Sequence, residues 1–320
     1  MKAQFLNDSG ALYPIIGGPM YPCSNPELVA AVSNAGGIGI VQPLTLTYVE
    51  GYDLREGLQY IRSLTERPIG MNALIEKSSK KYEEKMNAWI DIALEEGVRF
   101  FITSLGKPDW VVQKVHAYGG KVYHDVTDAA WAEIALNSGV DGFIAVNNRA
   151  GGHVGLKELS QLLKELQVHN LPVVCAGGVS DRAGYEEALS LGYSAVQMGT
   201  RFIASRECKA SDDYKQAIVE ADEEDIVLTQ NITGIPVSVI NTGYIRKLGL
   251  LPGRFARWML THPQLKYLIR MIYALRSLKN LKNGMYAKKG EQEFWQAGKS
   301  VKGITEVKTV NEIFDDLLTY

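Results

Sequence analysis

The sequence predicts a (β/α)8 TIM barrel with a second, mainly helical C-terminal subdomain. Eight short apolar runs alternate with helix-like segments between residues 13 and 200, a pattern typical of parallel strands covered by helices. The last two runs end in the glycine clusters Ala176-Gly177-Gly178 and Met198-Gly199-Thr200. In such barrels a phosphate group often binds the loops after the seventh and eighth strands. An open, doubly wound sheet has the same local pattern, but eight units with these glycines last favour the closed barrel.

The predicted strands are mostly apolar and have lengths typical of strands that are buried on both faces. They are Tyr13–Gly17, Gly37–Val41, Pro68–Asn72, Arg99–Thr103, Lys121–Asp125, Asp141–Val146, Leu171–Ala176 and Tyr193–Met198. Helices are predicted between them at Asn25–Ala35, Asp53–Leu64, Tyr82–Glu95, Trp110–Tyr118, Thr127–Ser138 and Arg182–Leu191. In the first of these helices, Asn25 and Pro26 are residue types preferred at the N-cap and in the first turn.

The predicted strands end near Thr200, which leaves about a third of the chain for a second region. We expect residues 1–206 to form the barrel, 207–300 an inserted substrate or lid subdomain, and 301–320 a C-terminal helix that returns to the barrel. Thr309 and Glu312 have the spacing of a capping box ahead of apolar residues, which predicts a helix over Thr309–Leu318. That helix would supply the eighth outer helix of the barrel.

The charge of the second region is unevenly distributed, although the net charge of the whole chain is only −2. Such a balance gives no electrostatic reason to expect a nucleic-acid partner. Residues 226–290 contain eleven Lys or Arg and no acid, and Leu265, Leu268, Ile272 and Leu275 repeat at helical spacing. This pattern predicts a basic amphipathic helix. It could cover the site, attract an anionic substrate or lie on a membrane surface.

Cysteine usage and hydropathy predict a cytoplasmic protein. Cys23, Cys175 and Cys208 show no paired spacing, which favours free thiols in a reducing compartment. The opening segment Met1–Gly10 lacks the apolar core of a signal peptide. Charged residues interrupt the longest apolar stretches well before the ~20 residues that a membrane span needs. No metal site is predicted.

The best candidate for catalysis follows the sixth predicted strand, in the loop Asn147–Gly155. His153 is the one histidine of this loop and is flanked by glycines, and histidine is the commonest general acid or base because it titrates near neutral pH. In an arbitrary glycine-rich loop such a histidine more often makes a structural hydrogen bond. Its position after a barrel strand, beside the predicted phosphate loops, favours catalysis here.

Several motifs in order along the chain now point to a known family. They are Gly18-Pro19-Met20, Ala30-Ala31-Val32-Ser33-Asn34-Ala35-Gly36-Gly37-Ile38-Gly39, Pro68-Ile69-Gly70-Met71-Asn72, Ala150-Gly151-Gly152-His153, Ala176-Gly177-Gly178 and Gln197-Met198-Gly199-Thr200-Arg201-Phe202. With them the sequence resembles the nitronate monooxygenases, formerly called 2-nitropropane dioxygenases. Related families are the flavin-dependent enoyl-ACP reductases and the NADH:quinone reductases. The resemblance covers about residues 14–206.

The resemblance implies FMN as cofactor and His153 as the catalytic residue. The implied cofactor-binding residues are Gly18, Pro19, Met20, Asn72, His124, Ala150, Gly151, Gly152, Gly177, Gly178, Gln197, Met198, Gly199 and Thr200. Of these, Met20 would lie against the isoalloxazine ring, Asn72 would bond the ring edge or ribityl chain, and His124 would be a weaker contact.

The resemblance implies an oxidoreductase that converts alkyl nitronates with O2 to carbonyl compounds and nitrite. His153 would remove the α-proton of a neutral nitroalkane. The same motifs suit an NAD(P)H-dependent reductase of quinones or enoyl thioesters, and Arg149 could then hold a dinucleotide phosphate. A barrel that binds a phosphate ligand without catalysis would also keep the glycines. A homodimer is one candidate for the oligomeric state.

Overall fold

The computed structural model describes residues 1–76, 80–232, 234–253 and 266–319. Eight parallel strands close into a barrel in the order β1-β2-β3-β4-β5-β6-β8-β9, which confirms the predicted fold class. The strands are β1 (Ile15–Gly17), β2 (Ile38–Val41), β3 (Ile69–Leu74), β4 (Phe100–Ser104), β5 (Lys121–Val126), β6 (Gly142–Val146), β8 (Val173–Ala176) and β9 (Ala195–Met198). Each lies within two residues of a predicted strand.

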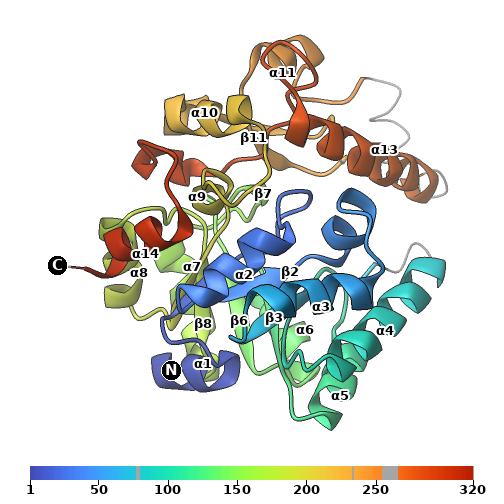
Figure 1. Ribbon diagram of the computed structural model, residues 1–320, viewed down its shortest axis with the longest axis vertical. Helices are drawn as coiled ribbons and strands as arrows, with labels where there is room; N and C mark the ends of the chain where they lie inside the picture. The colour runs from blue at the N-terminus through green and yellow to red at the C-terminus, as the bar shows by residue number, and fades with distance from the viewer. Residues whose placement is uncertain (77–79, 233, 254–265, 320) are drawn as a thin grey trace.

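Side chains of alternate residues fill the barrel, because successive residues of a strand point to opposite faces. The inner cluster includes Ile16, Ile40, Ile102, Tyr123, Ile144 and Val174, all buried. The N-terminal helix α1 (Lys2–Ser9) closes the amino end of the barrel (Figure 1). From it Phe5 packs edge-on against Phe100 and Tyr123, with ring centroids 6.1 and 6.0 Å away.

Helices cover the outside of the barrel. They are α2 (Pro26–Asn34), α3 (Leu54–Leu64), α4 (Lys80–Glu95), α5 (Asp109–Ala117), α6 (Ala129–Asn137), α7 (Leu159–Leu166) and α8 (Arg182–Leu191). A short π-helix (Thr45–Val49) and the single turn α9 (Thr200–Ile203) follow β2 and β9. Asn25 is the N-cap of α2 as predicted, but its side chain makes no capping bond. It instead donates to the Glu207 carbonyl and accepts from the Lys209 amide, and so ties the second region to the barrel.

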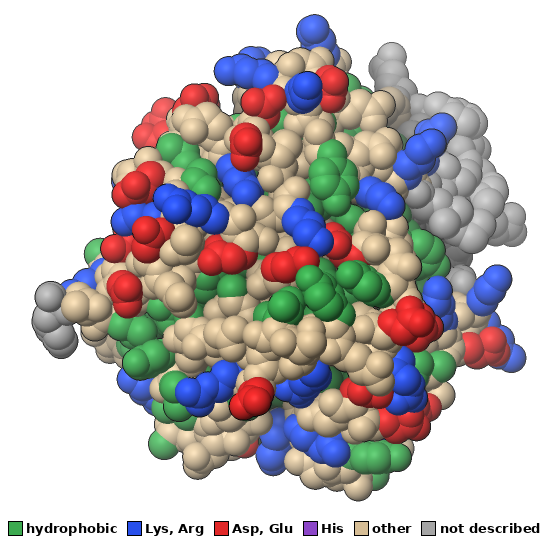
Figure 2. Space-filling view, viewed as in Figure 1, with side chains coloured by type: hydrophobic (Ala, Val, Ile, Leu, Met, Phe, Trp, Pro, Cys, Tyr) green, Lys and Arg blue, Asp and Glu red, His purple; other side chains and the backbone are tan. Residues whose placement is uncertain are grey.

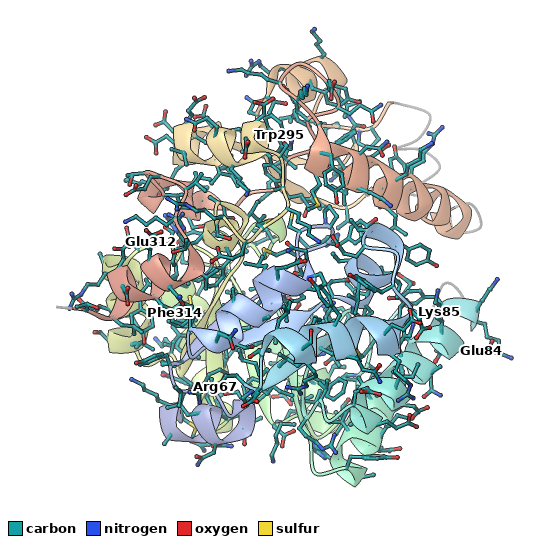
Figure 3. The ribbon with its side chains drawn as sticks, viewed as in Figure 1. Arg67, Glu84, Lys85, Trp295, Glu312 and Phe314 are labelled. Atoms are coloured by element: carbon teal, nitrogen blue, oxygen red, sulfur yellow. The ribbon has the colours of Figure 1, made fainter. Side chains whose placement is uncertain are left out.

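The eighth outer helix is α14 (Val310–Leu318), which packs against both α2 and α8 (Figure 1). Thr309 and Glu312 form the predicted capping box at its start. Figure 3 shows Phe314 on this helix, where its ring stacks on that of Phe202 at 6.2 Å and is buried. Helix α14 therefore fills the place between α8 and α2 in the outer layer of helices.

The second region contains α10 (Asp212–Glu220), α11 (Gly243–Leu248), α13 (Lys266–Tyr286) and two short 3₁₀ turns at Glu223–Asp225 and Lys299–Gly303. It also contains a three-stranded antiparallel sheet of β10 (Ile226–Thr229), β11 (Val237–Ile240) and β7 (Gly152–His153). The β7 strand comes from the loop after β6, so the barrel supplies one edge of this sheet. Trp295, labelled in Figure 3, stacks on Tyr214 at 5.5 Å and fixes α10 to the segment before α14.

Some predictions fall on residues that the structure does not describe. Leu265 lies outside the described residues, and so do the side chains of Leu268, Ile272 and Leu275, on which the predicted apolar repeat depends. No helix in the described ranges is long and apolar enough to cross a membrane. Acidic and basic side chains are interspersed over the face drawn in Figure 2. The three cysteines are buried and form no disulfide.

Candidate active site

Eight inward-facing positions mark the carboxyl end of the barrel. Alternation in phase with the inner cluster gives the last inward position of each strand: Gly18, Gln42, Asn72, Ser104, Asp125, Val146, Ala176 and Gln197. Three of these carry a buried side-chain oxygen that has no hydrogen-bond partner among the described residues: Asn72 Oδ1, Asp125 Oδ1 and Gln197 Oε1. Buried polar atoms are nearly always paired, so three such oxygens at one end of a barrel indicate a site for a ligand with hydrogen-bond donors.

The loop after β8 lies tightly against the loop after β6. Gly177 has a φ of +118°, and a Cβ atom there would lie 2.5 Å from Asn147 Oδ1 and 2.6 Å from the Ala150 amide nitrogen. Asn147 is buried and donates to the Gly177 carbonyl at 2.9 Å. Gly178 also has a positive φ, +86°, and a Cβ atom there would lie 2.8 Å from Arg149 Nε. The two loops thus form one packed unit that only glycine permits at position 177.

The loop after β9 meets the loop after β1. A Cβ on Gly199 would lie 3.3 Å from Met20 Sδ, and one on Gly18 would lie 3.1 Å from Gln197 Cγ. The backbone of Met20 is held by Ser24, whose hydroxyl accepts from the Met20 amide at 2.7 Å. The structure therefore brings together the residues of the first and last predicted motifs, with the Met20 side chain over Gly199.

A third segment, around Gly298, joins this assembly. The Gly298 amide donates to the buried Thr200 hydroxyl at 3.0 Å, and the Lys299 amide donates to the Arg149 carbonyl at 2.9 Å. A Cβ on Gly298 would lie 2.6 Å from the Gly151 nitrogen. Sequence reasoning missed Gly298, because nothing in its local pattern shows that it packs against a loop about 150 residues earlier.

His153 lies in β7, where it pairs with Val237 of β11. It therefore stands on the strand that joins the barrel to the second region. Its side chain is exposed to solvent, yet protein surrounds the ring closely enough that desolvation lowers the pKa of the imidazole below its usual value. A lowered pKa keeps the ring neutral near pH 7, which is the form that can accept a proton.

Two predicted cofactor residues point away from the barrel mouth. Register pairs His124 with Thr103 of β4 and Phe143 of β6 on the outer face, and the Thr103 hydroxyl lies 2.8 Å from His124 Nδ1. Burial lowers the pKa of His124 to about 4, so the ring is neutral. Met198 is likewise part of the outer core, and only its carbonyl reaches the loop, where it accepts from the Gly18 amide.

The inward position of β5 belongs to Asp125, which sequence reasoning did not select. Alternation along β5 was the available signal, since Tyr123 and Asp125 share a face. The sequence alone does not give the phase of that alternation, because polar residues occupy both faces near the end of the strand. Burial raises the pKa of Asp125 to about 7.

An ion pair lies beside the glycine loops of the candidate site. Arg149, beside Gly178, pairs with Glu223 of the second region through both of its terminal nitrogens. Both side chains are about a quarter to a third exposed, 31% and 25%, so the pair is accessible to a competing anion. Within the described residues, no cluster of three or more His, Cys, Asp or Glu could hold a metal ion.

The glycine loops, the unpartnered oxygens and His153 have the organisation of an enzyme site, and the comparisons define the class as an oxidoreductase. A family model described as nitronate monooxygenase matches residues 4–319. The chain belongs to the nitronate monooxygenase family, which confirms the resemblance seen in the motifs.

Individual relatives agree with this assignment. A probable nitronate monooxygenase from Staphylococcus saprophyticus is 32% identical over 278 residues, which cover 74% of this chain and 78% of that protein. A (3aS,4S,5R,7aS)-5-hydroxy-7a-methyl-1-oxo-octahydro-1H-indene-4-carboxyl-CoA dehydrogenase from Rhodococcus jostii is 30% identical over 240 residues, covering 75% of this chain and 65% of that protein. Among solved structures, FabK from Thermotoga maritima is similar with a TM-score of 0.79 at 28% identity, covering 98% of this chain and 94% of that one.

Proposed function

We propose that this protein is an FMN-dependent oxidoreductase that converts alkyl nitronates with O2 to carbonyl compounds and nitrite. The observation that carries the proposal is the group of buried, unpartnered oxygens on Asn72, Asp125 and Gln197. A flavin offers matching donors, namely the ring N3–H and the ribityl hydroxyls. Satisfying buried acceptors is worth about 1–3 kcal/mol each, so the site favours such a ligand.

The loops beside these oxygens suit the rest of FMN. The backbone at Gly178, Gly199 and Thr200 would hold the phosphate group, because loops without a Cβ let amide groups approach an anion closely. Met20 lies over Gly199 and would contact the flavin ring. Ala150, Gly151 and Gly152 would line the side nearest His153.

His153 would perform the proton transfer. When bound, FMN would supply the acceptor for the electrons that leave the substrate. For a neutral nitroalkane, an imidazole nitrogen of His153 would take the α-proton and leave the nitronate, and the resulting imidazolium would stabilise the anionic nitro group. The lowered pKa of His153 supplies the neutral base at physiological pH. Because β7 belongs to the sheet of the second region, that region sets the position of the base.

A second candidate function is NAD(P)H-dependent reduction of an enoyl thioester. It is favoured by the relative from Rhodococcus jostii, whose name specifies a carboxyl-CoA substrate. Arg149 and its accessible ion pair with Glu223 would then offer a cation to a phosphate of the dinucleotide or of CoA.

The deciding experiment is anaerobic mixing of the purified protein with propionate-3-nitronate, NADH or NADPH while the flavin absorbance is recorded. We expect a yellow protein that is bleached within seconds by the nitronate and only slowly by either nicotinamide. Rapid bleaching by a nicotinamide, with no response to nitronate, would establish the second candidate. A colourless protein that takes up no FMN on titration would refute both.

A further inference from the structure

Asp125 is an acidic side chain in the floor of the candidate site. Strand β5 runs in register between β4 and β6, with Tyr123 opposite Ile102 and Asp125 opposite Ile144. Ile102, Tyr123 and Ile144 all belong to the inner cluster of the barrel. Asp125 therefore points inward one step nearer the carboxyl end than Tyr123, level with Ile144 of β6 and with Ser104 at the end of β4.

The surroundings of this carboxyl group are nearly free of charge. Its inward neighbours in register are Ser104 of β4 and Ile144 of β6, and Asn72 and Gln197 share the barrel end. Two other titratable side chains of β5 have the same phase: Tyr123, whose pKa burial raises further above its usual value, and Lys121 toward the amino end, which pairs with Asp141. Burial is also the one cause that raises the pKa of Asp125, to about 7. Below that pH the group is a neutral acid, able to donate one hydrogen bond and accept others.

The carboxyl group lacks the partners that would explain an acid inside a barrel. Asp125 Oδ1 is buried and makes no hydrogen bond to any described residue, and no salt bridge involves Asp125 within the described ranges. By contrast, Asp8 at the other end of the barrel accepts from the Tyr123 hydroxyl at 3.0 Å. An unpaired inward acid is costly unless a ligand completes its hydrogen bonding.

We propose that Asp125 is a direct ligand of the bound flavin and contacts its polar edge from the floor of the barrel. This inference rests on the proposed function, since it requires FMN in the site. As a neutral acid, Asp125 donates to or accepts from the flavin without adding charge. As a carboxylate, it repels the negative charge of reduced flavin. The group therefore makes the affinity for reduced flavin depend on pH.

The first test is FMN binding by apo protein, followed by fluorescence quenching at pH 6. Asp125→Leu removes the polar group at similar size and should weaken binding about tenfold or more. Asp125→Asn keeps the shape and the hydrogen bonding and should stay within about threefold of the wild type. The matched control is Asp8→Asn, which changes a partly buried acid at the opposite end of the barrel and should leave FMN affinity unchanged. Circular dichroism establishes that each variant is folded.

The second test is the ratio of affinities for reduced and oxidised FMN between pH 5.5 and 8.5. In the wild type this ratio should fall about tenfold relative to Asp125→Asn as pH rises through the Asp125 pKa, equivalent to about 30 mV for a two-electron couple. Equal FMN affinity in the wild type and Asp125→Leu, with parallel pH curves for the wild type and Asp125→Asn, would overturn this inference alone. A wild type that binds no FMN would overturn the proposed function together with it.

Discussion

Replacing Gly177 with alanine separates two reasons for having glycine in the loop after β8. The φ of +118° is strained for any residue with a side chain, and a Cβ there would also lie 2.5 Å from Asn147 Oδ1 and 2.6 Å from the Ala150 amide nitrogen. Gly192 offers a matched control. Its φ is +113°, but its nearest neighbour for a Cβ is Leu163 Cδ2 at 3.9 Å, so alanine there is strained without a clash.

The expected magnitudes follow from these contacts. An unfavourable backbone region costs about 1–3 kcal/mol, and this should be the whole loss of unfolding free energy in Gly192→Ala. Overpacking adds about 1–3 kcal/mol, so Gly177→Ala should lose about 2–6 kcal/mol. The assay is urea denaturation of the apo proteins followed by circular dichroism, with FMN titration of each. Because the loop after β6 must also move, FMN affinity should fall in Gly177→Ala and stay unchanged in Gly192→Ala.

Two results would refute this reasoning. Equal destabilisation in the two variants would mean that the contact with Asn147 and Ala150 relaxes at no cost. Full FMN affinity in Gly177→Ala would mean that the packed unit of the two loops does not shape the phosphate site.

Four further predictions concern the base, the ion pair and the closing helix. His153→Ala should retain FMN and lose about 10²-fold or more in kcat/KM with a neutral nitroalkane, whereas His116→Asn on the barrel surface should be unaffected; steady-state assays would contradict this if both behaved alike. Because the His153 pKa is lowered, wild-type kcat/KM should be level at neutral pH and decline only as pH falls below 6.5 and through that pKa, and a decline already complete at pH 7 would exclude this base. Glu223→Gln should free Arg149, lower the KM for an anionic substrate a few-fold and make it more sensitive to salt; an unchanged KM at every ionic strength would count against a role for Arg149. Phe314→Ala should cost about 3–5 kcal/mol in urea unfolding, and a loss under about 1 kcal/mol would show that α14 contributes little to the barrel.

The barrel could be predicted from the sequence because each strand and each outer helix has its own local signal. Mostly apolar runs are found only where both faces are covered, and a capping box such as that of Thr309 and Glu312 marks the start of a helix without reference to the rest of the fold. The glycine motifs likewise predicted loops that the structure brings together at the candidate site.

Features that depend on distant contacts could not be predicted in this way. β7 is only two residues long and exists because β11 pairs with it. α1 has weak amphipathic character and is defined by Phe5 filling the end of the barrel. The sequence predicted His124 as a contact and did not indicate Asp125, because the neighbouring strands set which residues of β5 face inward.

The position of α14 in the chain has a consequence for biosynthesis. All eight barrel strands have left the ribosome once residue 198 has emerged, but the helix that covers Phe202 begins only at Val310. At ~5–20 residues per second, this delay is on the order of 5–20 s. During that interval the apolar surfaces of α2 and α8 that pack against α14 would be exposed, and they form an apolar seam. Co-translational chaperones could bind this apolar surface before α14 covers it. Loss of the final ten residues would leave the surface exposed permanently.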